Sequence, residues 1–461
     1  MLRPSVFFNL LFYSILFLAS RNSASTSNEK QNGDSTVAKV NLIDGHPDWI
    51  MQGNIYEVNI RQYTPEGNFK AFEKSLDRLK GMGVQTLWFM PINPISKVDR
   101  KGALGSYYAV SDYTKINPEY GTMDDWKGLV KHAHDMGFKV IIDWVPNHTG
   151  ADHPWLKSHP DFYEKDSTGK AISPFDWTDV RQLNFANKEM RDSMAAAMKF
   201  WVTETDIDGF RCDHVERFQS ELWKQSIPEL KKIKSILMLA EAEGGWIYSV
   251  GFDMDYGWKL FHTTVDVAAG KKTALSIDSV MTSLDTSSPK NALQLYFTSN
   301  HDENSWNKAD YKTMPGASHA PFAVLIQTIK RSIPLIYSGQ EEPFLDSISF
   351  FYKDTIQFNK YARAGFYKSL LNLRKNNAAL AANVSFKRIN VGNDKALFCY
   401  VREASGKKVF VILNLSSKEQ TIKITNTSLH GNPYNLFMGN NEPLSDKPWK
   451  IQPWGYVVYV Y

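Results

Sequence analysis

The segment LQLYFTSNHDEN, residues 293–304, begins as an apolar run and ends in polar residues that include His301 and Asp302. The apolar part favours a β-strand, so His301 and Asp302 are expected just beyond its carboxyl end. A single strand end of this kind most often leads into an ordinary solvated loop. Its importance therefore depends on whether other strands end in the same way.

Three other apolar runs also end on a carboxylate: KVIID stops at Asp143, DGFRCD at Asp213 and ILMLAE at Glu241. The segments between the runs are long enough to hold helices. Strands that alternate with helices predict a parallel sheet, and in a (β/α)8 barrel the catalytic groups lie at the carboxyl ends of the strands. The pattern therefore predicts an α/β fold, a (β/α)8 TIM barrel, with a candidate active site at one end.

The rest of the chain supplies enough further strands and helices for a complete barrel. Apolar residues at helical spacing predict the intervening helices, for example with Met190, Met194, Met198 and Trp201 on one face. The four strands that bring the count to eight are expected at 54–60, 84–90, 263–267 and 333–338.

Two segments depart from the barrel pattern. An irregular aromatic segment at about 150–185 is long for a connection and predicts a small inserted lobe. From about residue 385 the sequence changes to short alternating strands separated by turns, which predicts an antiparallel β-sandwich. The expected organisation is a signal peptide at 1–25, a linker at 26–45, a catalytic barrel at 46–380 and a C-terminal β-sandwich at 385–461.

Composition narrows the class of protein. The 461 residues are 43% hydrophobic, which indicates a globular fold, and the formal net charge is only +4 without a lysine and arginine block. Nucleic acid is therefore not expected as a partner. As a separate expectation, the protein is a monomer. Thirteen Trp and twenty-one Tyr supply flat amphipathic rings that suit sugar faces, although most such rings fill cores. The only cysteines, Cys212 and Cys399, are expected to be buried free thiols.

The N-terminus predicts export. Arg3 precedes an apolar stretch at 6–19, which is followed by the small residues Ser23, Ala24 and Ser25. A charged start, a short apolar core and a small-residue exit are typical of a secretory signal peptide, and the run is short for a membrane span. The expected location is secreted or periplasmic, with an uncleaved membrane anchor as the alternative.

The acids at the strand ends suit one reaction in particular. Retaining glycoside hydrolysis needs a carboxylate nucleophile, a proton donor and a further group that stabilises positive charge. Arg211 lies two residues before Asp213, on the same strand face, and would keep it ionised. Glu241 follows an apolar run that would favour its protonated form and a role as general acid/base. Metal binding by acids at strand ends is the competing interpretation.

Four of these segments, in this order and spacing, resemble the four ordered sequence regions of the α-amylase family, glycoside hydrolase family 13. They are DWVPNH at 143–148, GFRCD at 209–213, AE at 240–241 and FTSNHD at 297–302. The segment SYYAVSDY at 106–113 also resembles the family segment whose tyrosine stacks under the sugar, which makes Tyr108 that residue. The resemblance extends from about Trp49 to the C-terminus and implies a barrel, a small B lobe and a C-terminal sandwich.

The resemblance also implies roles for individual residues. Asp213 would be the nucleophile, Glu241 the acid/base and Asp302 the transition-state stabiliser. The implied substrate-binding residues are Tyr108, His148, Arg211 and His301. The implied structural residues are Asp143 and Asn147. Trp144, Trp246 and Trp306 are candidates for sugar subsites, with core packing as the alternative for each.

The implied activity is cleavage of α-1,4-glucosidic bonds in starch or maltooligosaccharides with retention. A 4-α-glucanotransferase of the same family is the close alternative. A barrel that has lost catalysis and serves as a carbohydrate-binding or partner subunit is the more distant one, and the intact Asp213, Glu241 and Asp302 argue against it.

The sequence departs from the family pattern at two places. Family amylases carry Lys and His three and four residues after the nucleophile, where this chain has Glu216 and Arg217. The family calcium site uses the region-one Asn, here Asn147, together with an Asp that Gln182 replaces. Loss of that charge weakens a site for a hard cation. No catalytic cofactor is expected, and structural calcium is doubtful, with Asn147 as a possible ligand.

Overall fold

The computed structural model describes residues 41–343 and 346–461, and within them eight parallel strands close into a barrel. The predicted signal peptide, and all but the last few residues of the predicted linker, lie outside the described residues. The barrel strands are β3 (Ile55–Val58), β4 (Thr86–Phe89), β5 (Lys139–Trp144), β8 (Gly209–Cys212), β9 (Leu237–Ala240), β10 (Met254–Tyr256), β11 (Leu293–Tyr296) and β12 (Ser332–Tyr337). The predicted TIM barrel is thus confirmed.

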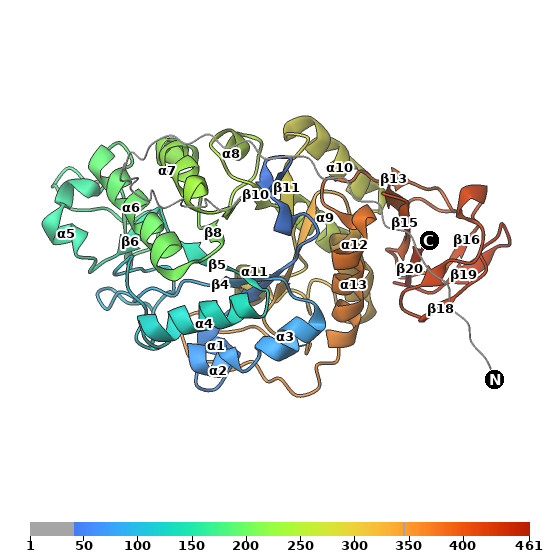
Figure 1. Ribbon diagram of the computed structural model, residues 1–461, viewed down its shortest axis with the longest axis horizontal. Helices are drawn as coiled ribbons and strands as arrows, with labels where there is room; N and C mark the ends of the chain where they lie inside the picture. Colours follow the sequence, from blue (N-terminus) through green and yellow to red (C-terminus); the bar gives the residue numbers. More distant parts are fainter. Residues whose placement is uncertain (1–40, 344–345) are drawn as a thin grey trace, which may run out of the picture. The chain divides into compact units, whose positions relative to one another are not determined.

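Helices follow the strands and cover the outside of the barrel (Figure 1). The predicted apolar face of α6 is buried, with Met190, Met194, Met198 and Trp201 all inaccessible to solvent. The helices are α1 (Ile60–Tyr63), α2 (Phe69–Glu73), α3 (Leu76–Met82), α4 (Met123–Asp135), α5 (Trp155–Ser158), α6 (Lys188–Thr205), α7 (Ser220–Ile233), α8 (Trp246–Ser249), α9 (Trp258–Ala268), α10 (Leu275–Ser287), α11 (His301–Asn307), α12 (His319–Thr328) and α13 (Ala364–Asn376).

The predicted sixth strand at 263–267 is wrong, because this segment lies in helix α9. The β-branched residues of TTVDV suggested a strand, but Leu260, Phe261, Thr264 and Val267 are buried at helical spacing. The true sixth strand, β10, has only three residues and pairs with β9 and β11. So short a strand carries no periodicity that separates it from a loop.

The inserted lobe leaves the barrel directly after β5. Strand β6 (His148–Gly150) pairs antiparallel with β7 (Val180–Gln182), with His148 opposite Gln182. Helix α5 lies between the two strands in the sequence, and α6 returns the chain to the barrel. Because the lobe starts at the carboxyl end of β5, its residues are held beside the strand ends that carry the predicted acids.

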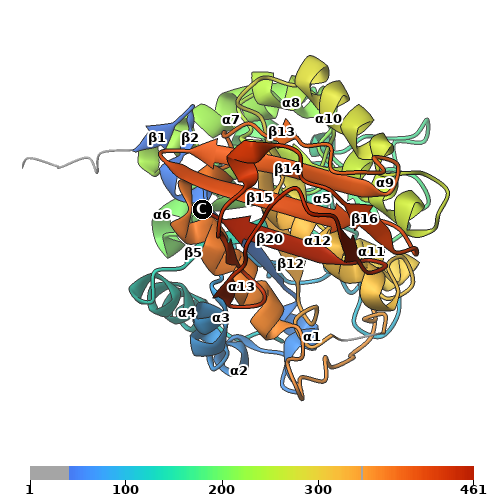
Figure 2. The same cartoon turned by 90° about the vertical axis from the view of Figure 1, so that its right-hand side faces the viewer.

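The C-terminal part forms antiparallel sheets, as predicted (Figure 2). The six-stranded sheet runs in the order β13, β14, β15, β20, β17, β18, and β16 pairs with β19. Buried Arg402 of β14 donates hydrogen bonds to the carbonyls of Thr328 and Ile329 at the end of α12, which fixes the sheet to the barrel. The strands are β13 (Lys387–Arg388), β14 (Leu397–Ala404), β15 (Lys407–Asn414), β16 (Gln420–Ile422), β17 (Tyr434–Asn435), β18 (Asn440–Asn441), β19 (Trp449–Ile451) and β20 (Tyr456–Val460), and a short pair at the start is β1 (Leu42–Ile43) and β2 (His46–Pro47).

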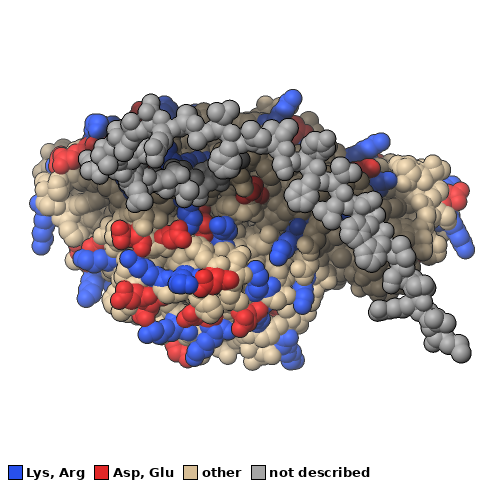
Figure 3. All heavy atoms as spheres, in the orientation of Figure 1, with Lys and Arg blue, Asp and Glu red and all other residues tan. Residues whose placement is uncertain are grey.

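Surface charges of both signs are intermingled over α2, α3 and α4 (Figure 3). Ion pairs such as Lys131 with Asp135 on α4 contribute to this mixture. Among the described residues no helix is long and apolar enough to span a membrane. Cys212 and Cys399 are both buried and free, as predicted.

Candidate active site

One arginine organises the carboxylates at the carboxyl ends of β5, β8 and β9. The side chain of Arg211 is fully buried, and its Nη1 donates to Asp143 Oδ1 at 2.9 Å and to Asp213 Oδ1 at 2.8 Å. Its Nη2 lies 3.0 Å from Glu241 Oε2, as an ion pair rather than an aligned hydrogen bond. We call Arg211, Asp143, Asp213 and Glu241 the charged cluster. Three carboxyl groups predicted from separate strands therefore share one cation.

A single guanidinium cannot neutralise three carboxylates. Burial raises the pKa of Asp143 to about 7, because the opposing attraction of Arg211 does not fully offset it and Asp213 adds like charge. Asp143 is completely inaccessible, whereas the side chains of Asp213 and Glu241 are 13% and 20% exposed. The cluster thus separates one carboxyl group inside the barrel from two that face solvent.

Glu241 is less isolated than its apolar strand suggests. In addition to Arg211, its Oε2 accepts a hydrogen bond from the backbone N–H of His214 at 2.8 Å. His214 has a φ of 43°, a left-handed conformation that turns the chain sharply after Asp213 and aims this N–H at Glu241. The sequence around Glu241 does not reveal these two partners, because β8 and the turn after it place them beside β9.

Asp302 approaches from the opposite side, on the first turn of α11. The helix is capped by Asn300, whose side chain accepts from the backbone N–H of Glu303. Asp302 Oδ2 lies 3.4 Å from His301 Nε2, and its side chain is 37% exposed. The cap fixes where the helix begins and therefore where Asp302 points.

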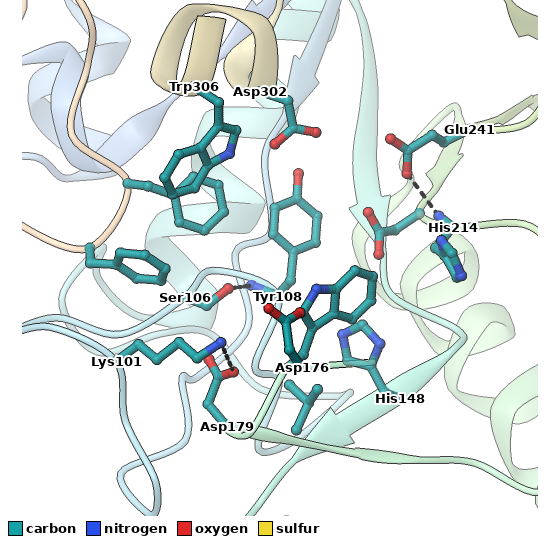
Figure 4. A pocket seen from close by; sticks show the side chains of 15 residues that line it. Lys101, Ser106, Tyr108, His148, Asp176, Asp179, His214, Glu241, Asp302 and Trp306 are labelled. Carbon is teal, nitrogen blue, oxygen red and sulfur yellow. Dashed lines mark hydrogen bonds and ion pairs between the residues drawn. The ribbon is translucent and has the colours of Figure 1, made fainter. Parts of the chain in front are cut away.

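Tyr108 lies next to Asp302 in the cavity, with its hydroxyl directed toward it (Figure 4). Its hydroxyl donates to Asp143 Oδ2 at 3.2 Å and lies 2.7 Å from His301 Nε2. Its ring is parallel to that of Phe350 with centroids 6.1 Å apart. Burial raises the pKa of Tyr108 well above its usual value, so the phenol stays protonated.

These groups surround a cavity of about 520 Å³. Asp213, Glu241 and Asp302 all line it, together with Tyr108 and His148. Burial lowers the pKa of His148 to about 4, so this histidine is neutral. The other predicted site residues lie behind this lining rather than in it; they are Arg211, His301, Asp143 and Asn147.

The three candidate tryptophans have different environments. Trp144 is fully buried against Tyr113 and Phe210, so it is a core residue and not a subsite. Trp246 lies outside the cavity lining, and the Arg217 guanidinium sits 5.2 Å from its ring centroid. Trp306 is 57% exposed and lines the cavity.

Several lining residues were not predicted as site residues, and most of them stand on loops with no recognisable pattern. The lobe and the loop before Tyr108 contribute an ion pair, with Lys101 Nζ 3.4 Å from Asp179 Oδ1. His214 packs edge-on against Trp177 and Phe175, each with ring centroids 5.5 Å away. The unpredicted lining residues are Lys101, Ser106, Asp176, Trp177, Asp179, Val180, His214, Phe350 and Phe351.

Asn147 and Gln182, which we call the amide cluster, satisfy each other. Gln182 Nε2 donates to both Asn147 Oδ1 and the Asn147 carbonyl at 3.1 Å, and Gln219 adds a longer bond to Asn147 Oδ1 at 3.4 Å. The oxygens that a calcium ion would bind therefore already accept hydrogen bonds, and no ligand charge is present. These residues do not fit a calcium site as they stand.

The aspartates of the lobe do not supply the missing charge. Asp161 accepts from Asn187, Asp166 from Thr168, and Asp179 pairs with Lys101, while Asp176 lines the cavity. In the part of the chain that the structure describes, no group of three or more His, Cys, Asp or Glu side chains is arranged to hold a metal ion.

A closed (β/α)8 barrel with three carboxylates around one cavity at its carboxyl end defines the class of barrel glycoside hydrolases. The chain belongs to the α-amylase family: the family model for the alpha amylase catalytic domain matches residues 24–182 and 174–396. It is therefore an α-amylase family glycoside hydrolase, as the resemblance implied.

Three of the proteins similar to this chain are α-amylases. Alpha-amylase 3 of Dictyoglomus thermophilum is 27% identical over 452 residues, covering 82% of this chain and 87% of that protein. A crystal structure of an α-amylase from Lactobacillus plantarum is 28% identical with a TM-score of 0.79, over 90% of this chain and 99% of its own. A noncanonic maltogenic α-amylase, AmyB from Thermotoga neapolitana, is 26% identical with a TM-score of 0.81 over the same shares.

Proposed function

We propose that this protein hydrolyses α-1,4-glucosidic bonds of starch or maltooligosaccharides by double displacement with retention. The observation that carries the proposal is the sharing of Arg211 by Asp213 and Glu241, both of which face the cavity. Two carboxyls on one guanidinium fit the close separation of about 5 to 5.5 Å that retaining enzymes use.

In the first step, a carboxylate oxygen of Asp213 attacks the anomeric carbon while Glu241, in its protonated form, gives its proton to the leaving glycosidic oxygen. The C–O bond to the leaving sugar breaks, and a glycosyl ester on Asp213 forms. In the second step, Glu241 takes a proton from water, the water oxygen attacks the anomeric carbon, and Asp213 is released as a carboxylate.

The other cavity residues would hold the sugar during these steps. Asp302 lines the same cavity as Glu241, where a carboxylate stabilises the positive charge that develops on the ring. Tyr108 presents its ring to the cavity, as a platform for the sugar face. Mixed surface charges and a small net charge suit a neutral polysaccharide.

Transfer to a second sugar is the alternative, and one observation favours it. The general acid lies on the leaving-group side, so His214, which contacts Glu241, marks that side. There His214, Trp177 and Phe175 form an aromatic wall, and Phe175 is 71% exposed. Rings at this place offer an acceptor sugar a surface on which to stack in place of water.

Product analysis on maltoheptaose, with and without added glucose as acceptor, tests both candidates. Hydrolysis predicts shorter maltooligosaccharides with the α-anomer formed first, independently of the acceptor. Transferase activity predicts longer products and a strong response to glucose. A β-anomeric initial product, or turnover that survives in Asp213→Asn, would contradict the mechanism.

We further propose that the chain is exported, on the basis of Arg3, the apolar stretch at 6–19 and the small residues after it. N-terminal sequencing of the protein recovered from its native host is expected to find a start between about Ser20 and Ser27. A start at Met1 in a membrane fraction would instead identify an anchor.

A further inference from the structure

An acidic residue outside the proposed catalytic set lies inside the barrel. Glu57 is the third residue of β3, and on the strand it shares a face with Ile55, which belongs to the apolar cluster that fills the barrel. Glu57 is completely buried. A buried carboxylate is costly unless it has a charged or hydrogen-bonded partner, so its contacts identify its role.

Within the described part of the chain, the side chain of Glu57 has one hydrogen-bond partner. Its Oε1 lies 2.5 Å from His301 Nδ1, and its Oε2 has no hydrogen-bond partner among the described residues. The two residues stand 244 positions apart in the chain, on β3 and at the start of α11. The contact exists only because the barrel closes.

Hydrogen-bond directions along this contact fix where the protons lie. In its ionised form, above its pKa of about 7, Asp143 accepts from Arg211 through Oδ1 and from Trp88 Nε1 through Oδ2, and the Tyr108 hydroxyl donates to the same Oδ2. The Tyr108 oxygen must then accept from His301 Nε2, 2.7 Å away. The other ring nitrogen, Nδ1, faces the Glu57 carboxylate and must also carry a proton.

We propose that Glu57 is a positioning residue: it holds His301 as a doubly protonated imidazolium that fixes the hydroxyl of Tyr108 and lies against Asp302. The chain of contacts runs from Glu57 through His301 and Tyr108 to Asp143 and joins β3 to β5. This inference deepens the proposed function, because Tyr108 and Asp302 are the groups expected to touch the sugar.

The charges around His301 agree with this assignment. Burial alone lowers the pKa of His301, but Asp302 and then Glu57 outweigh it, and the result is a pKa of about 9 despite the nearby Arg211. The titratable or charged groups that face this histidine are Glu57 on β3, Tyr108, Asp143 on β5, Arg211 on β8 and Asp302 on α11.

The central experiment replaces Glu57 by Gln, which keeps the shape and removes the charge. Histidine labelled with ¹⁵N reports the protonation of His301 directly, with His301→Gln used to assign its signals. In the unchanged protein both ring nitrogens are expected to stay protonated above neutral pH. In Glu57→Gln the His301 signals should titrate at least one pH unit lower.

Kinetics provide the second measurement. In Glu57→Gln, kcat on maltoheptaose is expected to fall about 10- to 100-fold, as when a partner that orients a functional group is changed, with a small change in KM. The basic limb of the kcat profile should move to lower pH. Glu57→Asp, which keeps the charge, should restore the His301 titration and part of kcat.

Glu303→Gln is the matched control. It removes a carboxyl group from the same helix, where Glu303 contacts Asn307 and not His301. Its His301 titration should not change. The proposal is overturned if His301 is neutral at pH 7 in the unchanged protein, or if folded Glu57→Gln leaves its titration and the kcat profile unaltered. Absence of glycosidase activity in the unchanged protein would refute the proposed function alone, because the ¹⁵N measurement still tests the Glu57 contact.

Discussion

The charged cluster and the amide cluster are both buried polar groups at the ends of barrel strands, yet they differ in how their polar atoms are satisfied. Each member of the amide cluster is satisfied by a neutral neighbour, with Gln182 donating twice to Asn147. In the charged cluster a single cation, Arg211, serves three carboxyl groups. The amide cluster therefore fixes the local shape of the chain. The charged cluster keeps carboxylates available for chemistry, although one arginine does not neutralise all of their negative charge.

The strongest way to break the charged cluster without breaking the fold is Asp213→Asn. The amide keeps the shape but cannot form the glycosyl ester, so kcat on maltoheptaose should fall on the order of 10⁴-fold or more. Thermal unfolding should change little, because loss of the ion pair between Asp213 and Arg211 is offset by loss of the repulsion between Asp213 and Asp143. Mass spectrometry of the unchanged protein after reaction with a slow fluorinated substrate should locate the sugar on Asp213. Its attachment to another residue would disprove the assignment.

Removal of Arg211 tests how much the charge balance of the charged cluster contributes to stability. Arg211→Met leaves Asp143, Asp213 and Glu241 without their shared partner, and breaking a buried ion pair in this way costs about 3 to 5 kcal/mol. The free energy of unfolding in urea measures the loss. Lys188→Met is the control, because its pair with Asp192 lies on the exposed surface of α6, where solvent screening leaves an ion pair little effect on stability. Equal losses of unfolding free energy in the two variants would show that the charged cluster contributes no more to stability than a surface ion pair.

The charged cluster should also make stability depend on pH, which the amide cluster cannot do. The pKa of Asp143 is raised from 3.8 to about 7 in the folded protein, so the folded state binds this proton more tightly than the unfolded chain. Its stabilising effect is therefore complete below about pH 4 and is lost as pH rises toward 7. Unfolding of Asp143→Asn should lack this decline, and parallel curves for the two proteins would contradict the prediction.

The smallest effect is expected at the amide cluster. Because Asn147 and Gln182 satisfy each other without charge, EDTA should change the melting temperature and activity little. Gln182→Asp would introduce a charged oxygen and should increase the response to calcium, measured as the shift in melting temperature with added ion. A large fall of melting temperature in EDTA, reversed by calcium, would show that the neutral pair conceals a cation site.

The sequence could indicate where Asp213 and Glu241 lie because each of them follows an apolar strand. Asp213 and Glu241 follow such runs directly, and in a parallel barrel all strand ends of this kind meet at one face. The short strand β10 escaped prediction because three residues carry no period, and the β-branched residues of α9 suggested a strand in its place. The lining residues of the lobe, such as Trp177 and Asp179, escaped because loop positions follow no pattern.

What the sequence determined by itself is therefore the order of strands, helices and acidic residues, since local periodicity encodes an element and its end. What only the tertiary structure decided is which charges meet. Barrel closure brings Glu57 of β3 against His301 and lets Arg211 serve three carboxyls from different strands. A pKa or a hydrogen-bond direction depends on neighbours within a few ångströms, and those neighbours are set by the packing of segments far apart in the chain.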